Sequence, residues 1–261
     1  MPELPDLEVF RRYFDSTALH QKIREVRILE DRLLEDITPA RFRERITGKT
    51  FESTHRHGKY LSAVLDDSSA VILHFGMTGF LSYYKESTDE SRHPRVIFDF
   101  DNGYHLAYDN MRMLGKVGYT EDMDEYIRRQ GLGPDAGRVD FTQFSQILAG
   151  KRGMIKSAFM DQSALAGLGN IYTDELLFHA GFHPKAQVTD LTERDYRLLF
   201  DTMQEVLLTA IEEKVNPANF PPGYLLGHRS EGTPCPKCGE GEIRKTKVSS
   251  RSTYFCPSHQ E

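Results

Sequence analysis

The chain has 261 residues, of which 39% are hydrophobic and 28% are charged. This length exceeds one typical domain, and the composition excludes a disordered chain in favour of a globular protein with a sizeable core. No apolar run reaches the roughly 18 residues that a membrane-spanning helix needs. The start does not look like a signal peptide, so we expect a cytoplasmic protein without a membrane partner.

The net charge of −6 argues by itself against a nucleic-acid partner, because phosphate binding usually requires a basic surface. The charges are unevenly distributed, however. Residues 228–261 hold six basic and four acidic side chains, whereas acidic residues gather around 86–90 and 121–125. The charge count therefore leaves a nucleic-acid partner open.

The first half of the chain is predicted to be rich in β-strands. Pro5 suits the first turn of a helix, which an apolar stripe continues to about residue 19. β-Branched and aromatic residues then predict strands within 22–29, 50–65, 70–84, 95–100 and 104–108. Asp101-Asn102-Gly103 predicts a tight hairpin between the last two strands, because Asn-Gly tolerates positive φ.

After a segment rich in Gly and Pro at 131–137, the pattern becomes helical. Asp140 and Gln143 resemble a capping box, and Thr192 is placed to cap a long helix with one apolar face. Between them, a tight turn at 167–172 leads into another helix that ends near Gly181. The predicted order is a β-rich domain, a linker, a helical domain and a short tail.

The tail carries four potential metal ligands. Cys235-x2-Cys238 is followed by seventeen residues and then by Cys256-x2-His259, a spacing that fits a tetrahedral zinc site. Free thiols are the alternative, and His228 competes with His259 as the fourth ligand. Clustered cysteines in a reducing compartment favour a metal over a disulfide. We predict one structural zinc ion, because four protein ligands leave no position for water.

The start Met1-Pro2-Glu3 offers a different chemistry. Removal of Met1 would make Pro2 an N-terminal amine, and such an amine can attack an aldehyde carbon to form an iminium. An ordinary N-terminus is the alternative reading of the same residues.

Three other polar residues have two readings each. Lys59 is either a solvated lysine or a functional cation. Asn170 is either a turn residue or part of a phosphate site at the start of a helix. Arg251 is either solvated or a bidentate phosphate clamp.

Four segments together resemble the formamidopyrimidine-DNA glycosylase/endonuclease VIII family, in the family's order from residue 2 to the end. They are Pro2-Glu3-Leu4-Pro5, Gly58-Lys59-Tyr60-Leu61, Gly169-Asn170-Ile171-Tyr172-x-Asp174-Glu175 and Arg251-Ser-Thr-Tyr-Phe-Cys256. The resemblance implies an α+β multidomain fold with an N-terminal helix and two-layer β-sandwich, a helix-two-turn-helix domain and a zinc-finger hairpin. We place the catalytic domain at 1–125, the linker at 126–139, the helical domain at 140–226 and the zinc finger at 227–261.

The resemblance also implies a function: base-excision repair by a monomeric DNA glycosylase and abasic-site lyase, associated with the nucleoid, that acts on damaged double-stranded DNA. By resemblance, Pro2 attacks C1′ of a flipped-out nucleotide and forms an iminium, which leads to β- and δ-elimination. Glu3 handles protons at the sugar ring. Lys59, counted among the catalytic residues, joins Asn170 and Arg251 in gripping the phosphates that flank the lesion.

Met77, Arg112 and Leu114 match residues that fill the gap left by the flipped nucleotide, and Arg112 would face the orphaned base. The alternative is that Met77 and Leu114 belong to the core. Lys156 is also placed among the DNA-binding residues.

Several positions depart from the family's pattern. Asp6 stands in place of a longer acid, Met113 in place of an arginine and Leu114 in place of a phenylalanine. The Pro-rich segment 215–232 is shorter than the capping loop of members that are specialised for 8-oxoguanine. We therefore expect oxidised pyrimidines or ring-opened purines to be preferred over 8-oxoguanine.

Two other functions compete with this one. A chain that keeps Met1 would bind abasic or damaged DNA without catalysis, since a blocked Pro2 cannot form the iminium. A zinc-tailed scaffold for protein partners is the weaker alternative, because it leaves the Pro2-Glu3 start unexplained.

Overall fold

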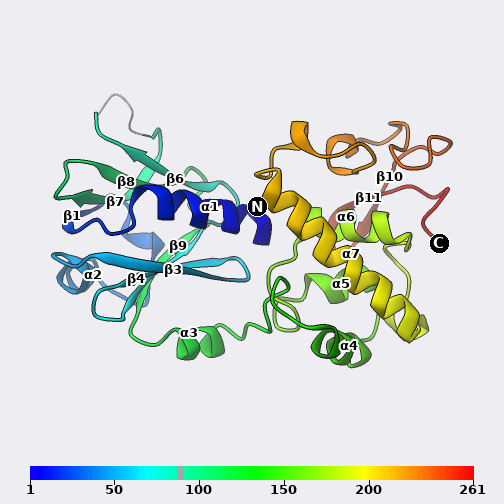
Figure 1. Cartoon of the computed structure of the whole chain (residues 1–261), viewed down its shortest axis with the longest axis horizontal. Coiled ribbons are helices and arrows are strands. Elements are labelled where there is room, and N and C mark those ends of the chain that lie inside the picture. Colours follow the sequence, from blue (N-terminus) through cyan, green and yellow to red (C-terminus); the bar gives the residue numbers. More distant parts are fainter. Residues whose placement is uncertain (87–90) are drawn as a thin grey trace. The chain divides into compact units, whose positions relative to one another are not determined.

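A computed structural model describes residues 1–86 and 91–261 of the chain. The chain divides into two compact units, Met1–Pro2 with Asp6–Gln130 and Glu3–Pro5 with Gly131–Glu261 (Figure 1). The division falls at residue 130, and the predicted domain boundaries at 125, 139 and 226 stay a prediction. Within the described residues, no helix is both long and apolar enough to cross a membrane.

The first unit holds two antiparallel-rich sheets and three helices. The helices are α1 (Leu4–Thr17, whose first two residues group with the second unit), α2 (Pro39–Ile46) and α3 (Met123–Arg129). The strands are β1 (Ile23–Ile28), β2 (Leu34–Glu35), β3 (Phe51–His57), β4 (Tyr60–Leu65), β5 (Ala70–His74), β6 (Gly79–Tyr84), β7 (Pro94–Phe100), β8 (His105–Asn110) and β9 (Lys116–Thr120), with a 3-10 turn η1 (Asp31–Leu33).

The two sheets pack face to face, as the predicted two-layer sandwich requires. One has the strand order β1-β7-β8-β6 and the other β2-β9-β5-β4-β3. Phe51 of the second sheet meets Phe98 of the first with ring centroids 5.7 Å apart, and Phe14 of α1 lies 5.0 Å from Phe51. All three rings are fully buried, so α1 and both sheets share one core. This aromatic contact defines which face of each strand points inward.

The predicted strands are present, but two of the predicted segments each contain two strands. The segment 50–65 folds into β3 and β4, and 70–84 folds into β5 and β6, which belong to different sheets. The hairpin at Asp101-Asn102-Gly103 joins β7 to β8, with positive φ at Gly103. The sequence pattern missed β2, β9, α2 and α3, which are short or charged elements. Thr38, which caps α2, and Pro39 at its first turn are the signals that mark that helix.

The second unit is helical, with a β-hairpin near its end. Its helices are α4 (Phe141–Ala149), α5 (Ile155–Met160), α6 (Asn170–Ala180) and α7 (Glu193–Glu212), and its strands are β10 (Arg244–Val248) and β11 (Arg251–Phe255). Short 3-10 turns lie at η3 (Val188–Asp190), η4 (Pro217–Asn219) and η5 (Leu226–His228). Asp140 caps α4, and Thr192 forms a full capping box with Asp195 at α7, so both predicted helix starts are observed.

Two tight turns between α5 and α6 complete the helix-two-turn-helix. Asp161 Oδ1 accepts hydrogen bonds from the backbone N–H and the hydroxyl of Ser163 at 3.0 and 2.6 Å. Gln162 Nε2 donates to the Leu168 carbonyl at 2.7 Å, and Gln162 Oε1 accepts from the Gly167 N–H at 3.1 Å. Side chains thus satisfy the backbone of a loop that has no ladder of its own, and they fix where α6 begins.

Candidate nucleic-acid interface and metal centre

The first turn of α6 binds the carboxylate of Glu3. Glu3 Oε2 accepts from the Gly169 N–H at 2.8 Å and the Tyr172 N–H at 3.1 Å, while Oε1 accepts from the Ile171 N–H at 2.8 Å. These N–H groups would otherwise lack partners at the start of a helix, where the helix dipole also favours a negative group. Glu3 is 2% exposed, so the carboxylate is held in one orientation.

Two glycines allow this close approach. A Cβ on Gly169 would lie 2.5 Å from Glu3 Cδ, and one on Gly167, where φ is +122°, would lie 2.7 Å from Leu4 Cδ1. The Leu4 N–H also donates to the Gly167 carbonyl at 3.0 Å. The Gly-Leu-Gly sequence is therefore explained by the seat that it forms for residues 3 and 4, and Pro2 is bonded directly to the anchored Glu3.

Lys156 on α5 is the centre of a buried polar network. Its ammonium donates to Asn170 Oδ1 at 2.7 Å, Asp174 Oδ1 at 2.5 Å and Thr253 Oγ1 at 2.7 Å. Asp174 Oδ2 also accepts from Arg229 Nη2 at 2.8 Å. The network joins α5, α6, the chain before the finger and β11, so it fixes the finger hairpin on the helices.

Burial perturbs both partners of the central pair. Desolvation lowers the pKa of Lys156, and desolvation raises the pKa of Asp174, while their mutual attraction opposes both shifts. The Lys156 side chain is 0% exposed and its three N–H bonds are all used, so in this structure it does not offer a donor to a phosphate. These bonds give Lys156 a positioning role for Asn170 and β11, and its predicted DNA contact stays a prediction.

Asn170 belongs to this network, and Arg251 lies on β11, which the network holds. Asn170 Nδ2 donates to the Ser252 carbonyl at 2.9 Å, which ties the start of α6 to β11. Arg251 is exposed at the first position of β11, next to a two-residue turn in which Ser249 and Ser250 both have positive φ. Arg251 thus stands at the tip of the finger hairpin, with its charge facing solvent.

Lys59 lies in the first unit, in the two-residue turn between β3 and β4. Of the two turn residues, Gly58 has positive φ and Lys59 does not, while His57 and Tyr60 pair on either side of the turn. This is the pattern of a type II′ turn. The Lys59 side chain is only 7% exposed, which excludes the reading of a solvated lysine. Burial is the main reason that the pKa of His74 is lowered to about 4, and the charges of Lys116 and Lys59 lower it further. The His74 ring is therefore neutral at pH 7.

Met77, Arg112 and Leu114 lie on two loops, residues 75–78 and 111–115, which we call the paired loops. The fully buried Asn110 connects them: its Nδ2 donates to the Phe75 carbonyl at 3.1 Å and its Oδ1 accepts from the Leu114 N–H at 3.3 Å. The Arg112 N–H donates to Thr78 Oγ1 at 3.2 Å across the same junction.

The paired loops expose apolar side chains to water. Met77 is 42% exposed and Leu114 is 51% exposed, which excludes the reading that both are core residues. Met111 and Met113 are also exposed, at 52% and 36%, and the sequence analysis did not single them out as surface residues. Several exposed apolar side chains on two connected loops indicate a binding site.

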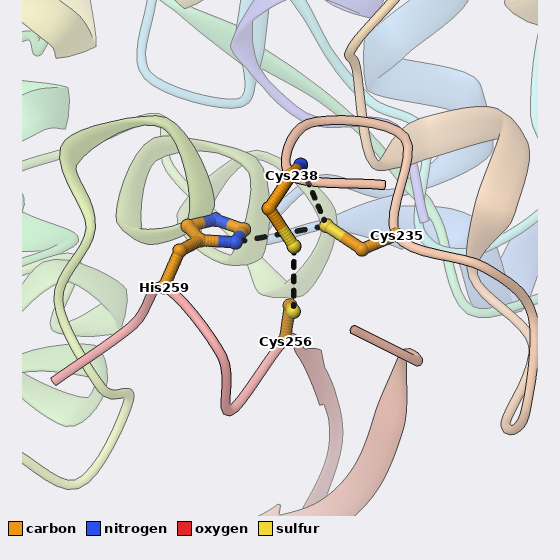
Figure 2. Close-up of side chains that lie close together, drawn as sticks. All are labelled: Cys235, Cys238, Cys256 and His259. Atoms are coloured by element: carbon orange, nitrogen blue, oxygen red, sulfur yellow. Dashed lines mark hydrogen bonds between the residues drawn. The ribbon is translucent and has the colours of Figure 1, made fainter. Parts of the chain in front are cut away.

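The four predicted metal ligands converge in the second unit (Figure 2). Their ligand atoms all lie within 4.8 Å of one another, with Cys235 Sγ 3.6 Å from His259 Nδ1 and Cys238 Sγ 3.7 Å from Cys256 Sγ. Zinc–sulfur bonds of about 2.3 Å in a tetrahedron place neighbouring sulfurs about 3.8 Å apart, so the side chains fit a tetrahedral ion. His228 is not part of the cluster.

A second contact fixes His259. Its Nε2 lies 3.1 Å from the Phe178 carbonyl, and donation to that oxygen leaves Nδ1 as the metal-binding nitrogen. The Cys238 N–H approaches Cys235 Sγ at 3.5 Å, as in the tight turns that carry paired cysteine ligands. The cluster therefore has the ligand number, the spacing and the outer contacts of a structural metal site.

Comparison with known proteins agrees with this architecture. Residues 1–117 match the Formamidopyrimidine-DNA glycosylase N-terminal domain and residues 131–220 match the Formamidopyrimidine-DNA glycosylase H2TH domain. A "Formamidopyrimidine-DNA glycosylase" of Pelotomaculum thermopropionicum is 33% identical over 100% of this chain and 99% of its own length. The chain belongs to the formamidopyrimidine-DNA glycosylase family.

Two solved structures are similar over the full length of both chains. One is a Lactococcus lactis FPG mutant in complex with DNA that contains Fapy-dG, with a TM-score of 0.89 and 29% identity. The other is a MutM protein in complex with DNA that contains carbocyclic 8-oxo-G, also with a TM-score of 0.89 and 29% identity. The predicted α+β multidomain fold is thereby confirmed.

The sequence analysis missed the residues that hold the site together. Asp174 and Thr253 lie inside quoted motifs but were given no role, while Asn110 and Arg229 lie outside them. A buried polar residue is recognised by its partners, and many of these are distant: Lys156 lies 18 positions from Asp174 and 97 from Thr253, and Asn110 lies 35 from Phe75. The one signal in the sequence was that Asp174 is a charged residue within an otherwise apolar helical segment.

We expect Lys156→Met to destabilise the second unit by about 3 kcal/mol, because removal of one partner leaves the Asp174 and Asn170 oxygens without their donor. Urea unfolding followed by tyrosine fluorescence measures the loss, since the chain has 12 Tyr and no Trp. Hydrogen exchange should show the loss of protection in α5, α6 and β11.

The control is Lys185→Met, which removes an exposed lysine from the same unit and should leave stability within about 0.5 kcal/mol of the parent. A Lys156→Met protein that is as stable as this control but binds DNA less tightly would contradict the positioning role and restore a direct contact.

Proposed function

We propose that this protein is a bifunctional DNA glycosylase of the formamidopyrimidine type, which removes oxidised bases from double-stranded DNA and cleaves the strand at the abasic site. Family membership supports DNA glycosylase activity in DNA repair. Binding to damaged duplex DNA is supported by the solved relative bound to Fapy-dG DNA. We take the working form to be a monomer in which Met1 has been removed.

The observation that carries the proposal is the seat of Glu3 on α6. Three N–H bonds hold the Glu3 carboxylate, and Gly169 and Gly167 make room for Glu3 and Leu4. The nucleophile that we assign is the nitrogen of Pro2, the residue directly before Glu3. An N-terminal amine is normally mobile, and ordering it before substrate arrives removes an entropic cost from the attack. A protein that only recognised damage would not need this ordered start.

The chemistry follows from a free Pro2 amine. The nitrogen bonds to C1′ as the bond from C1′ to the base breaks, and the departing base takes a proton. Opening of the sugar ring then gives an iminium between C1′ and Pro2, and its positive charge acidifies the C2′ proton. Loss of that proton expels the 3′ phosphate, and a second elimination expels the 5′ phosphate. We assign proton exchange at the sugar to Glu3.

The start of α1 favours a reactive amine. A secondary amine is mostly protonated near neutral pH, whereas the nucleophile must be neutral. α1 begins at Leu4, and the partial positive charge of its first N–H groups lies two residues from Pro2. This charge favours the neutral amine.

The remaining assigned residues would bind DNA. Asn170, Arg251 and Lys59 are proposed to contact phosphates, which position the duplex and carry no sequence information. Met77 and Leu114 are proposed to occupy the gap left by the flipped nucleotide, with Arg112 toward the orphaned base, because exposed apolar side chains can unstack and kink a duplex.

The lesion preference is proposed to favour ring-opened purines and oxidised pyrimidines over 8-oxoguanine. The segment 215–232 is a packed connection in this structure: Tyr224 is 9% exposed, and the Leu225 N–H donates to Glu175 Oε1 at 2.7 Å. It therefore lacks a long loop that could fold over an extruded base and bond to its edge.

The lyase chemistry predicts a covalent adduct. Borohydride reduction of the protein with an abasic-site oligonucleotide should trap the iminium, and peptide mapping by mass spectrometry should place it on Pro2. Chains that retain Met1 provide the control within one preparation, because they differ only by that residue and should carry no adduct.

An adduct on Lys59, or on the Met1-retaining chains, would contradict Pro2 as the nucleophile. Folded, Met1-free protein that binds the oligonucleotide and forms no adduct would instead be a damage-binding protein without catalysis.

We expect elemental analysis to find about one zinc ion per chain. His259→Ala and Cys256→Ala should lose the metal or bind it far more weakly, and protection of β10 and β11 from hydrogen exchange should fall, because metal binding and folding are coupled in such sites. His228→Ala is the control and should retain the ion. Metal loss in His228→Ala but not in His259→Ala would reverse the assignment of the fourth ligand.

The lesion preference predicts different single-turnover excision rates. We expect 8-oxoguanine to be removed about fivefold more slowly than a formamidopyrimidine or dihydrouracil, since one missing hydrogen bond of about 1 kcal/mol costs about that factor. The three lesions are compared opposite cytosine in otherwise identical duplexes. Equal or faster removal of 8-oxoguanine would contradict the assigned preference.

A further inference from the structure

A pocket lies on the first unit, on the outer face of the sheet β1-β7-β8-β6. Leu81 and Tyr108 point into the sandwich core, so their neighbours Phe80 and Asp109 point to the opposite face. The pocket has a volume of about 520 Å³, which is within the range of small-molecule sites. Its lining includes Thr78, Phe80, Ser91, Arg92, Asp109 and Met111.

Two buried polar atoms of this lining have no hydrogen-bond partner within the described part of the chain. They are Asp109 Oδ1 and Ser91 Oγ. Asp109 is 1% exposed, and its other oxygen, Oδ2, accepts from the His93 N–H at 2.7 Å. Leaving a buried acceptor without a donor is unfavourable, so two such atoms in one pocket point to a ligand that carries donors.

The same pocket offers a surface for stacking. Phe80 lies directly across the strands from Asp109, which places the aromatic ring beside the carboxylate. Phe80 is 41% exposed and Met111 is 52% exposed, so both can be covered by a flat ligand. The exposed Arg92 adds a positive charge at the rim. An aromatic face, a hydrogen-bond acceptor and a nearby cation are the features that bind an unpaired nucleotide.

We propose that this pocket binds an unpaired nucleobase that carries an exocyclic amino group. The base would stack on Phe80, its amino group would donate to Asp109 Oδ1, and its phosphate would face Arg92. Cytosine, adenine and guanine have such an amino group, whereas thymine does not. The pocket therefore distinguishes bases, unlike the phosphate contacts proposed for Asn170 and Arg251.

The position of the pocket indicates where the base comes from. Thr78 and Met111 line the pocket and directly follow or precede Met77 and Arg112 of the paired loops. A base displaced from the stack next to those loops would reach the pocket without a long path. This inference rests on the proposed function, and it adds base discrimination to the same DNA-binding surface. The base is either the orphaned base opposite the lesion or an unpaired base of a single strand.

Binding affinities of variants test the proposal. The full-length, metal-loaded protein is titrated by fluorescence anisotropy, at one salt concentration, against duplexes with a tetrahydrofuran abasic analogue opposite cytosine or thymine. Single-stranded oligo-dC and oligo-dT form the second arm. We expect Asp109→Asn to reduce the preference for cytosine over thymine by about tenfold, because the charged acceptor is lost. We expect Phe80→Ala to weaken binding by about tenfold, because stacking is lost.

The control is Leu208→Ala, which truncates a side chain that is 56% exposed on α7 of the other unit and should bind like the parent. Phe80→Ala removes a half-exposed ring, so it keeps the test valid if Asp109→Asn does not fold. An effect seen only with the duplexes would identify the bound base as the orphaned base opposite the lesion. An effect seen only with the single strands would identify it as a base of an unpaired strand.

Unchanged affinity and base preference in both folded variants would overturn the proposal, and Ser91 and Asp109 would then be satisfied by water. Borohydride trapping on Pro2 is measured in parallel. If trapping is lost and the base preference is intact, the proposed chemistry is contradicted and the pocket proposal stands. If trapping is normal and the variants have no effect, the pocket proposal is contradicted and the proposed chemistry stands.

Discussion

The first turn of α6 is the feature on which the second unit depends. Its backbone N–H groups bind Glu3, and its side chains Asn170 and Asp174 bind Lys156. One turn of helix thus serves as an anion site along its axis and as an acceptor site on its flank, so it binds the buried carboxylate of Glu3 and the buried ammonium of Lys156. The arrangement explains why an acidic residue at position 3 and a lysine in α5 are both buried in a chain whose net charge is −6.

The buried pair of Lys156 and Asp174 also determines how the finger is held. A buried lysine needs a partner, and Asp174 is the charged partner of Lys156. The Asp174 carboxylate also accepts hydrogen bonds from Arg229 and, at 3.1 Å, from the Tyr254 N–H. The metal cluster holds Cys256 directly after β11 and the network bonds residues 252–254 within it, so Arg251 at the tip projects from a rigid base. Such rigidity costs less entropy when a phosphate binds.

The sequence predicted the elements and the ligand spacing better than the contacts. The metal ligands could be identified because both pairs are local, with two residues between the members, and the structure brings all four together. The burial of Lys59 and Lys156 could not be read from the sequence, because a lysine is exposed by default and the partners of Lys156 lie far away in the chain. The short strand β9 was missed because Gly118 interrupts its apolar pattern.

The apolar exposure of the first unit and the acidity of the chain have a common consequence for recognition. The long-range attraction of this protein to DNA is weak, because its 39 acidic side chains outnumber its 33 Lys and Arg side chains. Affinity would then depend on short-range contacts, namely insertion of Met77 and Leu114 and stacking on Phe80. The exposed apolar surface of these side chains is buried only when the duplex is opened. An intact duplex offers no place for these side chains, whereas a weakened base pair does. The same balance of charge and apolar surface that reduces non-specific binding therefore favours damaged positions over undamaged ones.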